Sequence, residues 1–264
     1  MPLASTSLAL LIATIALSTA MAAAWVAQRA TGRTGWIDAI WTFGVGATAA
    51  GLAAAPLGEE DGAGWRRGAV AVAVALWAVR LGSHIIARTR KAPDDPRYRK
   101  LIETGGSAAP PRLFAFLQSQ ALVGVVLAFA VTLAAHAPSP TLRAQDIGGL
   151  ALFSIALVGE AAADAELARF QANPANRGRI CDIKLWSRSR HPNYFFEWLV
   201  WIAFALTATG DAVGLSAWLA PALMYSILRY ASGVPPLEDH MLLTRGDEFR
   251  AYRRRTPVFF PRIF

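Results

Sequence analysis

Residues 113–137 read LFAFLQSQALVGVVLAFAVTLAAHA, and this stretch decides the fold because it contains no Asp, Glu, Lys or Arg. About 20 apolar residues are enough for a helix to cross the hydrocarbon core of a membrane. Similar stretches occupy residues 3–27, 36–57, 68–87, 145–168, 194–209 and 212–231. They are rich in Ala and lack the alternation of a β-barrel. We therefore predict an all-α integral membrane protein with about seven transmembrane helices, in a single multi-pass domain over residues 1–264.

The composition agrees with a membrane protein. Hydrophobic residues make up 55% of the chain and charged residues only 17%, whereas soluble domains carry about 25% charged residues. This balance excludes a disordered chain and argues against an ordinary soluble globule. The single Cys181 excludes a disulfide within the chain. The four histidines lie far apart and none has zinc-ligand spacing, so we expect no metal site.

The net charge of +8 indicates an orientation. Of the 26 Lys and Arg residues, 22 fall in the odd-numbered loops between the predicted spans or in the C-terminal tail. Loops with an excess of basic residues stay in the cytoplasm. We therefore expect the N-terminus outside and the C-terminus inside, in the cell inner (cytoplasmic) membrane, and no nucleic-acid partner. Residues 1–30 are predicted to be the first transmembrane helix; a cleaved signal peptide is the alternative, although no positive charge precedes the apolar run.

Charged residues inside the spans point to a site. Ionisable side chains are costly in a bilayer and usually face a protein interior. Glu160 and Asp164 are four residues apart, so they share one face of a helix. Trp77, Arg80 and His84 form another stripe, and Asp38 lies in the second span. These residues predict a polar pocket open to the cytoplasm; ion pairs between helices are the alternative.

A second cluster follows the fifth span. Residues 173–179 read NPANRGR, and residues 184–194 read KLWSRSRHPNY. Pro192 fits the first turn of a helix, from which Asn193 and Glu197 would project on one face. Basic side chains beside a helix N-terminus suit phosphate groups. Contact with anionic membrane lipid is the alternative, but lipid contact does not need Asn193 and Glu197, which favours a shaped pocket. No phosphate-binding glycine motif occurs in a strand-to-helix context, so a nucleotide would bind outside a Rossmann or P-loop fold.

These residues carry a family resemblance. The stretch from Glu160 to Trp198, with Ser189-Arg190-His191-Pro192-Asn193-Tyr194-Phe195 as its most specific part, resembles the C-terminal domain of the steroid 5α-reductase family. Ser232-Gly233-Val234-Pro235, Glu238 and the ending around Tyr252 match as well, as do Asp38-Ala-Ile-Trp41 and Leu76-Trp77-Ala-Val-Arg80. The similarity is closest to the bacterial membrane branch of that family and covers roughly residues 33–262.

The resemblance implies an NADPH-dependent reductase that transfers hydride to the activated C=C (enone) of a lipophilic, steroid-like substrate. It implies a cofactor-binding C-terminal half over residues 144–264. Asp164, Asn193 and Glu197 match nicotinamide-nucleotide-binding positions of the family, and four arginines are candidate phosphate partners. The full cofactor-binding set is Glu160, Asp164, Arg169, Asn173, Arg177, Arg179, Arg190, His191, Asn193, Tyr194, Glu197 and Glu238.

The reaction also needs a donor to the developing enolate. We predict that the donor lies in the catalytic group Asp38, Trp77, Arg80 and His84. The steroid enzymes hold the steroid ketone with a Gln-Glu pair and a Tyr, whereas this chain offers Asp38, and Trp77 near the Tyr position. Another lipid-soluble enone or alkene is therefore an equal candidate for the substrate.

An S-adenosylmethionine-dependent methyltransferase is the alternative function. Isoprenylcysteine and phospholipid methyltransferases share the Arg-His-Pro-x-Tyr stretch and a following Glu. Their cofactor has no phosphates, so the many arginines of residues 169–190 favour NADPH. A transporter built from inverted repeats is not indicated, because no repeat is apparent in the sequence.

Overall fold

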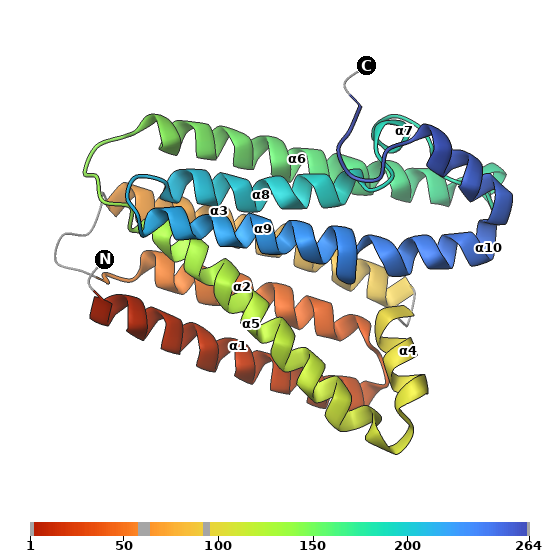
Figure 1. Ribbon diagram of the computed structural model, residues 1–264, viewed down its shortest axis with the longest axis horizontal. Helices are drawn as coiled ribbons and strands as arrows, with labels where there is room; N and C mark the ends of the chain where they lie inside the picture. Colours follow the sequence, from red (N-terminus) through yellow and green to blue (C-terminus); the bar gives the residue numbers. More distant parts are fainter. Residues whose placement is uncertain (1–2, 58–63, 92–95, 263–264) are drawn as a thin grey trace. The chain divides into compact units, whose positions relative to one another are not determined.

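The computed structural model describes residues 3–57, 64–91 and 96–262, and its regular structure there is entirely helical (Figure 1). The α-helices are α1 (Leu3–Thr31), α2 (Gly35–Ala54), α3 (Gly64–Lys91), α4 (Pro96–Gly105), α5 (Ala109–Ala135), α6 (Ala144–Ala172), α7 (Leu185–Arg188), α8 (Pro192–Ala208), α9 (Leu219–Ser226) and α10 (Val234–Arg255). Short 3-10 helices cover Gly106–Ala108 (η1), Pro174–Asn176 (η2) and Gly214–Trp218 (η3), and a π-helix covers Ile227–Ala231 (η4). The all-α prediction is confirmed for the described residues; residues 1, 2, 58–63, 92–95, 263 and 264 of the predicted ranges lie outside them.

Five helices in the described part of the chain are long and apolar enough to cross a membrane: Ala4–Thr31, Gly35–Ala54, Gly64–Arg90, Leu101–Ala135 and Ala144–Ala172. They coincide with the first five predicted spans, and they make the chain a multi-pass membrane protein. The sixth predicted span forms α8, which has 17 residues. The seventh does not form one regular helix, because its residues are divided among η3, α9 and η4.

The chain divides into two compact units. Unit 1 comprises Met1–Gly149 and Phe204–Ala220, and unit 2 comprises Leu150–Ala203 and Pro221–Phe264. All four predicted catalytic residues belong to unit 1, and all twelve predicted cofactor-binding residues belong to unit 2. The predicted single domain over residues 1–264 and the cofactor-binding half over residues 144–264 remain predictions.

In unit 1, α2 packs against α1, α3 and α5 (Figure 1). Small residues allow α2 and α3 to approach closely. A Cβ atom placed on Gly46 would lie 2.2 Å from the Cβ of Ala78, and one on Gly82 would lie 2.5 Å from the Phe43 ring. Helices in membranes commonly associate through small residues, because van der Waals packing replaces the hydrophobic effect there.

We expect Gly46→Ala to lower the free energy of unfolding by about 1–3 kcal/mol, because the added methyl group forces α2 and α3 apart. Gly51→Ala is the matched control on the same helix, since a Cβ there meets no atom within 4 Å. This variant should be neutral or gain up to about 1 kcal/mol from the higher helix propensity of Ala. Equilibrium unfolding in mild detergent measures both. Equal stability of the two variants would disprove close packing at Gly46.

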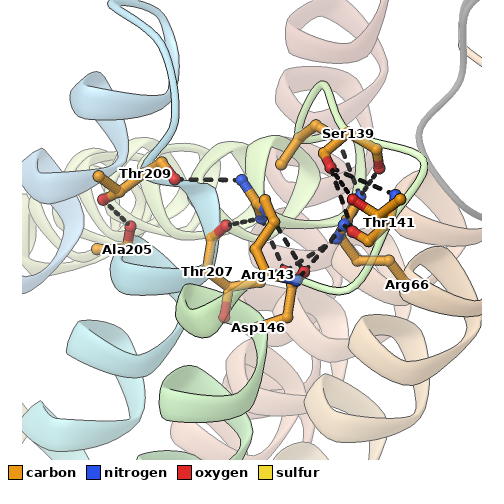
Figure 2. A network of polar contacts seen from close by, with 9 residues as sticks. Arg66, Ser139, Thr141, Arg143, Asp146, Ala205, Thr207 and Thr209 are labelled. Atoms are coloured by element: carbon orange, nitrogen blue, oxygen red, sulfur yellow. Dashed lines mark hydrogen bonds and ion pairs between the residues drawn. The ribbon is translucent and has the colours of Figure 1, made fainter.

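A buried network of polar contacts lies within unit 1 (Figure 2). Arg66, at the start of α3, is 1% exposed and donates to both carboxylate oxygens of Asp146, each at 2.9 Å. Its remaining N–H groups donate to the carbonyls of the loop between α5 and α6, at Ala137 (3.1 Å), Ser139 (2.7 Å) and Thr141 (2.9 Å).

The guanidinium of Arg143 also binds Asp146, with Nη2 at 2.7 Å from Oδ1. It also donates to the carbonyl oxygens of Thr207 (2.7 Å) and Thr209 (3.2 Å), where α8 ends (Figure 2). Carbonyls at a helix C-terminus carry partial negative charge and lack partners within the helix. The two arginines and one aspartate therefore join the beginnings of α3 and α6, the loop before α6 and the end of α8.

In unit 2, aromatic side chains form much of the packing. Phe259 is 1% exposed, and its ring lies 5.1 Å from that of Tyr225 and 6.0 Å from that of Trp198, measured between centroids. Trp198 Nε1 donates to the carbonyl of Pro221 at 3.0 Å, and Trp186 Nε1 donates to that of Ala163 at 2.9 Å. These contacts fix α7, α8 and the C-terminal tail within the unit.

Candidate functional site

The centre of the candidate site is a contact between α6 and α8 in unit 2. Asp164 lies on α6, and Asn193 is the second residue of α8, directly after Pro192. Asn193 Nδ2 donates to Asp164 Oδ1 at 3.2 Å. The helices approach closely because residue 159 is Gly: a Cβ there would lie 2.3 Å from the Phe196 ring. Two residues predicted to bind the cofactor, 29 positions apart in the chain, are thus brought together.

Two further carboxylates, Glu160 and Glu197, lie on the same two helices. Glu160, Asp164 and Glu197 are all buried. A buried carboxylate is stable only if it is hydrogen-bonded or paired. Glu197 Oε1 accepts a hydrogen bond of 2.9 Å from Trp201 Nε1, one turn further along α8. Both predicted pairs therefore lie on helices, with the predicted spacing of one turn. Glu160 and Asp164 are one turn apart on α6, and Asn193 and Glu197 are one turn apart on α8.

The last turn of α6 and the loop after it present basic residues to solvent. Asn173 caps η2, and its side chain accepts a hydrogen bond from the Ala175 N–H at 3.0 Å. Gly178 has φ +84°, a left-handed conformation that favours Gly. Arg169, Arg177 and Arg179 are exposed. Exposed guanidinium groups can bind phosphate oxygens in a bidentate manner.

Arg190, His191 and Glu238 form a separate cluster. Arg190 Nε donates to Glu238 Oε1 at 2.7 Å, and His191 Nε2 lies 3.3 Å from the same oxygen. The Arg190 guanidinium also donates to the carbonyls of Thr256 (2.7 Å) and Arg253 (3.2 Å). Arg253 lies 3.4 Å from Glu238 Oε2. These contacts attach residues 190 and 191 to α10, so Arg190 serves an internal ion pair in this structure.

The charge states in the cluster follow from its contacts. Burial raises the pKa of the Glu238 carboxyl, but hydrogen bonds from His191 and Arg190 outweigh burial and lower this pKa to about 2. Burial lowers the pKa of His191, and the hydrogen bond to Glu238 offsets this only in part. At neutral pH the cluster therefore holds an ionised Glu238 and a neutral His191. The Tyr194 ring stacks on the His191 ring, with centroids 5.5 Å apart.

The C-terminal tail contacts the same region of unit 2. The Arg190 N–H donates to the Pro257 carbonyl (2.9 Å), and the Arg262 N–H donates to the Arg188 carbonyl (3.0 Å). Ser189 Oγ donates to the Phe259 carbonyl at 2.8 Å and accepts from the His191 N–H at 3.2 Å. The tail therefore holds the segment from which α8 begins. Its mixture of arginines and aromatic residues is also typical of an interfacial anchor, so composition alone did not reveal these contacts.

Unit 1 contains the predicted catalytic residues. Trp77 is fully buried on α3, and Arg80 and His84 are half-buried on the same helix. Asp38, on α2, accepts a hydrogen bond of 2.6 Å from the hydroxyl of Tyr98.

Sequence reasoning missed Tyr98, because the short helix α4 lies in a charged segment that we assigned to a loop. Gln120 on α5 was missed as well; its Nε2 donates to the Tyr98 oxygen at 3.0 Å. The signal that could have found it is a pair of polar amides, Gln118 and Gln120, inside an otherwise apolar span.

In the described residues no group of three or more His, Cys, Asp or Glu side chains is arranged to hold a metal ion. The structure thus defines a class: an all-helical, multi-pass membrane protein with an acid–amide pair between two helices, one of which ends in a segment with exposed arginines. Residues 24–256 match the family described as "Protein of unknown function (DUF1295)", and the chain belongs to this family. No curated protein and no solved structure matches the chain.

Proposed function

We propose that this protein is a membrane-embedded NADPH-dependent reductase that transfers hydride to the C=C of a lipophilic, steroid-like enone. The observation that supports this most is the hydrogen bond between Asn193 and Asp164. Both residues, together with Glu197, are those that the resemblance to steroid 5α-reductases assigns to nicotinamide-nucleotide binding. The matched family is associated with proteins of that type.

The side chains fit the cofactor chemically. NADPH, when bound, supplies the hydride. Asn193 is held by Asp164, and Glu197 is held by Trp201, so both residues of α8 have fixed orientations. An amide and carboxylates in fixed positions can hydrogen-bond the carboxamide and ribose hydroxyls of a nicotinamide nucleotide. The exposed Arg169, Arg177 and Arg179 suit its phosphates.

The proposal includes the membrane topology. α8 and the helical segment of residues 214–231 form the sixth and seventh spans, which completes the set that begins with the five long apolar helices. In this arrangement the N-terminus lies outside and the C-terminus inside the inner membrane, because 22 of the 26 basic residues fall in the odd-numbered loops and the tail, on one side of the membrane.

The function is tested by ligand-dependent stability in mild detergent. A ligand that binds only the folded state raises the apparent stability with its concentration, by about 2.7 kcal/mol at 100 times its Kd. We expect NADPH to raise the melting temperature and S-adenosylmethionine to leave it unchanged. A shift with S-adenosylmethionine alone would contradict the reductase and support the methyltransferase.

We expect Asn193→Ala and Glu197→Ala each to abolish the NADPH shift, because each removes a side chain that we assign to the cofactor. Ser154→Ala is the matched control: it also removes a side-chain hydrogen bond, the one of 2.8 Å from Oγ to the Leu150 carbonyl, but at an exposed position of α6. The control should keep the wild-type NADPH shift. Unchanged NADPH binding in both α8 variants would remove them from the cofactor site.

A further inference from the structure

We propose that Ser189 is a positioning residue of the nicotinamide-nucleotide site. Its hydroxyl fixes the beginning of α8 against the C-terminal tail, and this holds the Asn193 side chain towards Asp164. The inference rests on the proposed reductase function and concerns residues of unit 2 alone. Ser189 lies between α7 and α8 and is 0% exposed. It is absent from the predicted cofactor-binding set.

The Ser189 hydroxyl serves as donor and acceptor at once. Its Oγ accepts a hydrogen bond of 3.2 Å from the His191 N–H, which closes the turn that leads into α8. It also donates to the Phe259 carbonyl at 2.8 Å. Serine commonly closes such a turn by accepting from the backbone N–H two residues on, and the turn needs nothing more. The donation to a residue 70 positions away therefore ties the turn to the tail.

The tail is also attached without the Ser189 side chain. The Arg190 N–H donates to the Pro257 carbonyl at 2.9 Å. On the other side of Ser189, the Arg188 carbonyl accepts from the Arg262 N–H at 3.0 Å. Both bonds join main-chain atoms, so they do not depend on the side chain at position 189. A substitution there is therefore expected to leave the tail in place and to change the turn before α8.

Asn193 is sensitive to the geometry of that turn, because it lies two residues after His191. Both ends of its amide are bound: Nδ2 donates to Asp164 Oδ1 at 3.2 Å, and Oδ1 accepts from the Tyr194 N–H at 3.0 Å. Hydrogen bonds from N–H to oxygen are usually about 2.7–3.2 Å long, so the bond to Asp164 is at the long end of the range. A small shift of the first turn of α8 therefore breaks this bond and releases the amide that we assign to the cofactor.

The test measures the Kd for NADPH of the full chain in mild detergent, from the fluorescence of the bound dihydronicotinamide and well below the melting temperature of each variant. We expect Ser189→Ala to raise this Kd about 10-fold, because the His191 N–H and the Phe259 carbonyl lose a buried hydrogen-bond partner. Ser187→Ala is the matched control, since its hydroxyl makes an exposed bond of 2.7 Å to the Lys184 carbonyl. The control should keep the wild-type Kd.

A second pair of variants isolates the hydroxyl. Thr and Val have nearly the same size, so any steric strain is common to Ser189→Thr and Ser189→Val, and only the Thr variant keeps the donor and acceptor. We expect the Thr variant to bind NADPH about 10-fold more tightly than the Val variant. A purely structural residue would instead lower the melting temperature of the cofactor-free protein and leave the Kd of the folded protein unchanged.

The outcomes separate the two proposals. A wild-type protein that does not bind NADPH contradicts the reductase itself, and the role of Ser189 with it. If the wild type binds NADPH and the Ser189→Ala variant has a Kd within about threefold of it, the reductase stands and the positioning role of Ser189 is overturned. Equal Kd values for the Thr and Val variants overturn that role as well.

Discussion

Replacing Arg66 with Met is expected to lower the free energy of unfolding by about 3–5 kcal/mol, the usual cost of removing one partner from a buried ion pair. The side chain is 1% exposed, and its N–H groups reach one carboxylate and three backbone carbonyls. Met fills much of the space but donates no hydrogen bond. The carbonyls of Ala137, Ser139 and Thr141 then lose a donor, and an unsatisfied buried polar group costs about 1–3 kcal/mol.

The measurement is equilibrium unfolding in mild detergent, followed by tryptophan fluorescence. Arg88→Met is the matched control, because Arg88 lies on the same helix α3 and is exposed. Its effect should stay within about 0.5 kcal/mol, as for most surface substitutions. The double variant Arg66→Met/Asp146→Leu should lose less than the two single losses combined, because the partners form one network. Additive losses, or equal losses at Arg66 and Arg88, would show that the network contributes little.

The second large effect is a loss of stability in acid that depends on Glu238. The pKa of this carboxyl is lowered from 4.5 to about 2 in the folded protein, since hydrogen bonds from His191 and Arg190 outweigh burial. The folded state therefore binds its proton less readily than the unfolded state. The resulting stabilisation is fully present above pH 4.5 and is lost as the pH falls towards 2. It amounts to about 3 kcal/mol, because each pKa unit corresponds to about 1.4 kcal/mol.

Glu238→Gln removes the titrating group, so the variant should be less stable than the wild type at pH 6 and nearly equal to it at pH 2. Asp239→Asn is the control, because Asp239 is an exposed acid on the same helix. Its stability should follow the wild-type curve over the whole range. Thermal unfolding at a series of pH values gives the comparison. A constant difference between wild type and Glu238→Gln at all pH values would contradict the lowered pKa.

The sequence predicted the parts of the fold that depend on hydrophobicity. Five apolar stretches became five long helices, because helices and closed β-barrels are the stable forms in lipid and these stretches lack the alternation of a barrel. Residues 212–231 show the limit of that reasoning. This stretch is mostly apolar, with Arg229 as its one charged residue, yet the backbone changes from 3-10 to α to π geometry. At its end, Gly233 lies so close to Leu228 that a Cβ would fall 2.4 Å from the Leu228 carbonyl oxygen. Such local contacts leave no hydropathy signal.

Part of the candidate site could likewise be predicted from the sequence, and part of it could not. Helical spacing predicted that Glu160 would align with Asp164 and Asn193 with Glu197, since this depends only on 3.6 residues per turn. The contact between Asn193 and Asp164 depends on how α6 and α8 pack, and the bond from Arg190 to Glu238 joins residues 48 positions apart. In the sequence, Arg66 falls in the loop between the predicted spans 36–57 and 68–87. Its burial became visible only once Asp146, 80 positions away, lay beside it.

The attachment of the tail also constrains the order of events during synthesis. Ser189 and the Phe259 carbonyl that it binds are 70 positions apart, so the segment before α8 is translated long before its partner exists. Chains fold from the N-terminal side while they are being made. The polar groups at the start of α8 are therefore bound to water when they leave the ribosome, and residues 256–262 replace that water afterwards. Translation up to Arg262 is thus the step at which the beginning of α8 acquires its final hydrogen bonds.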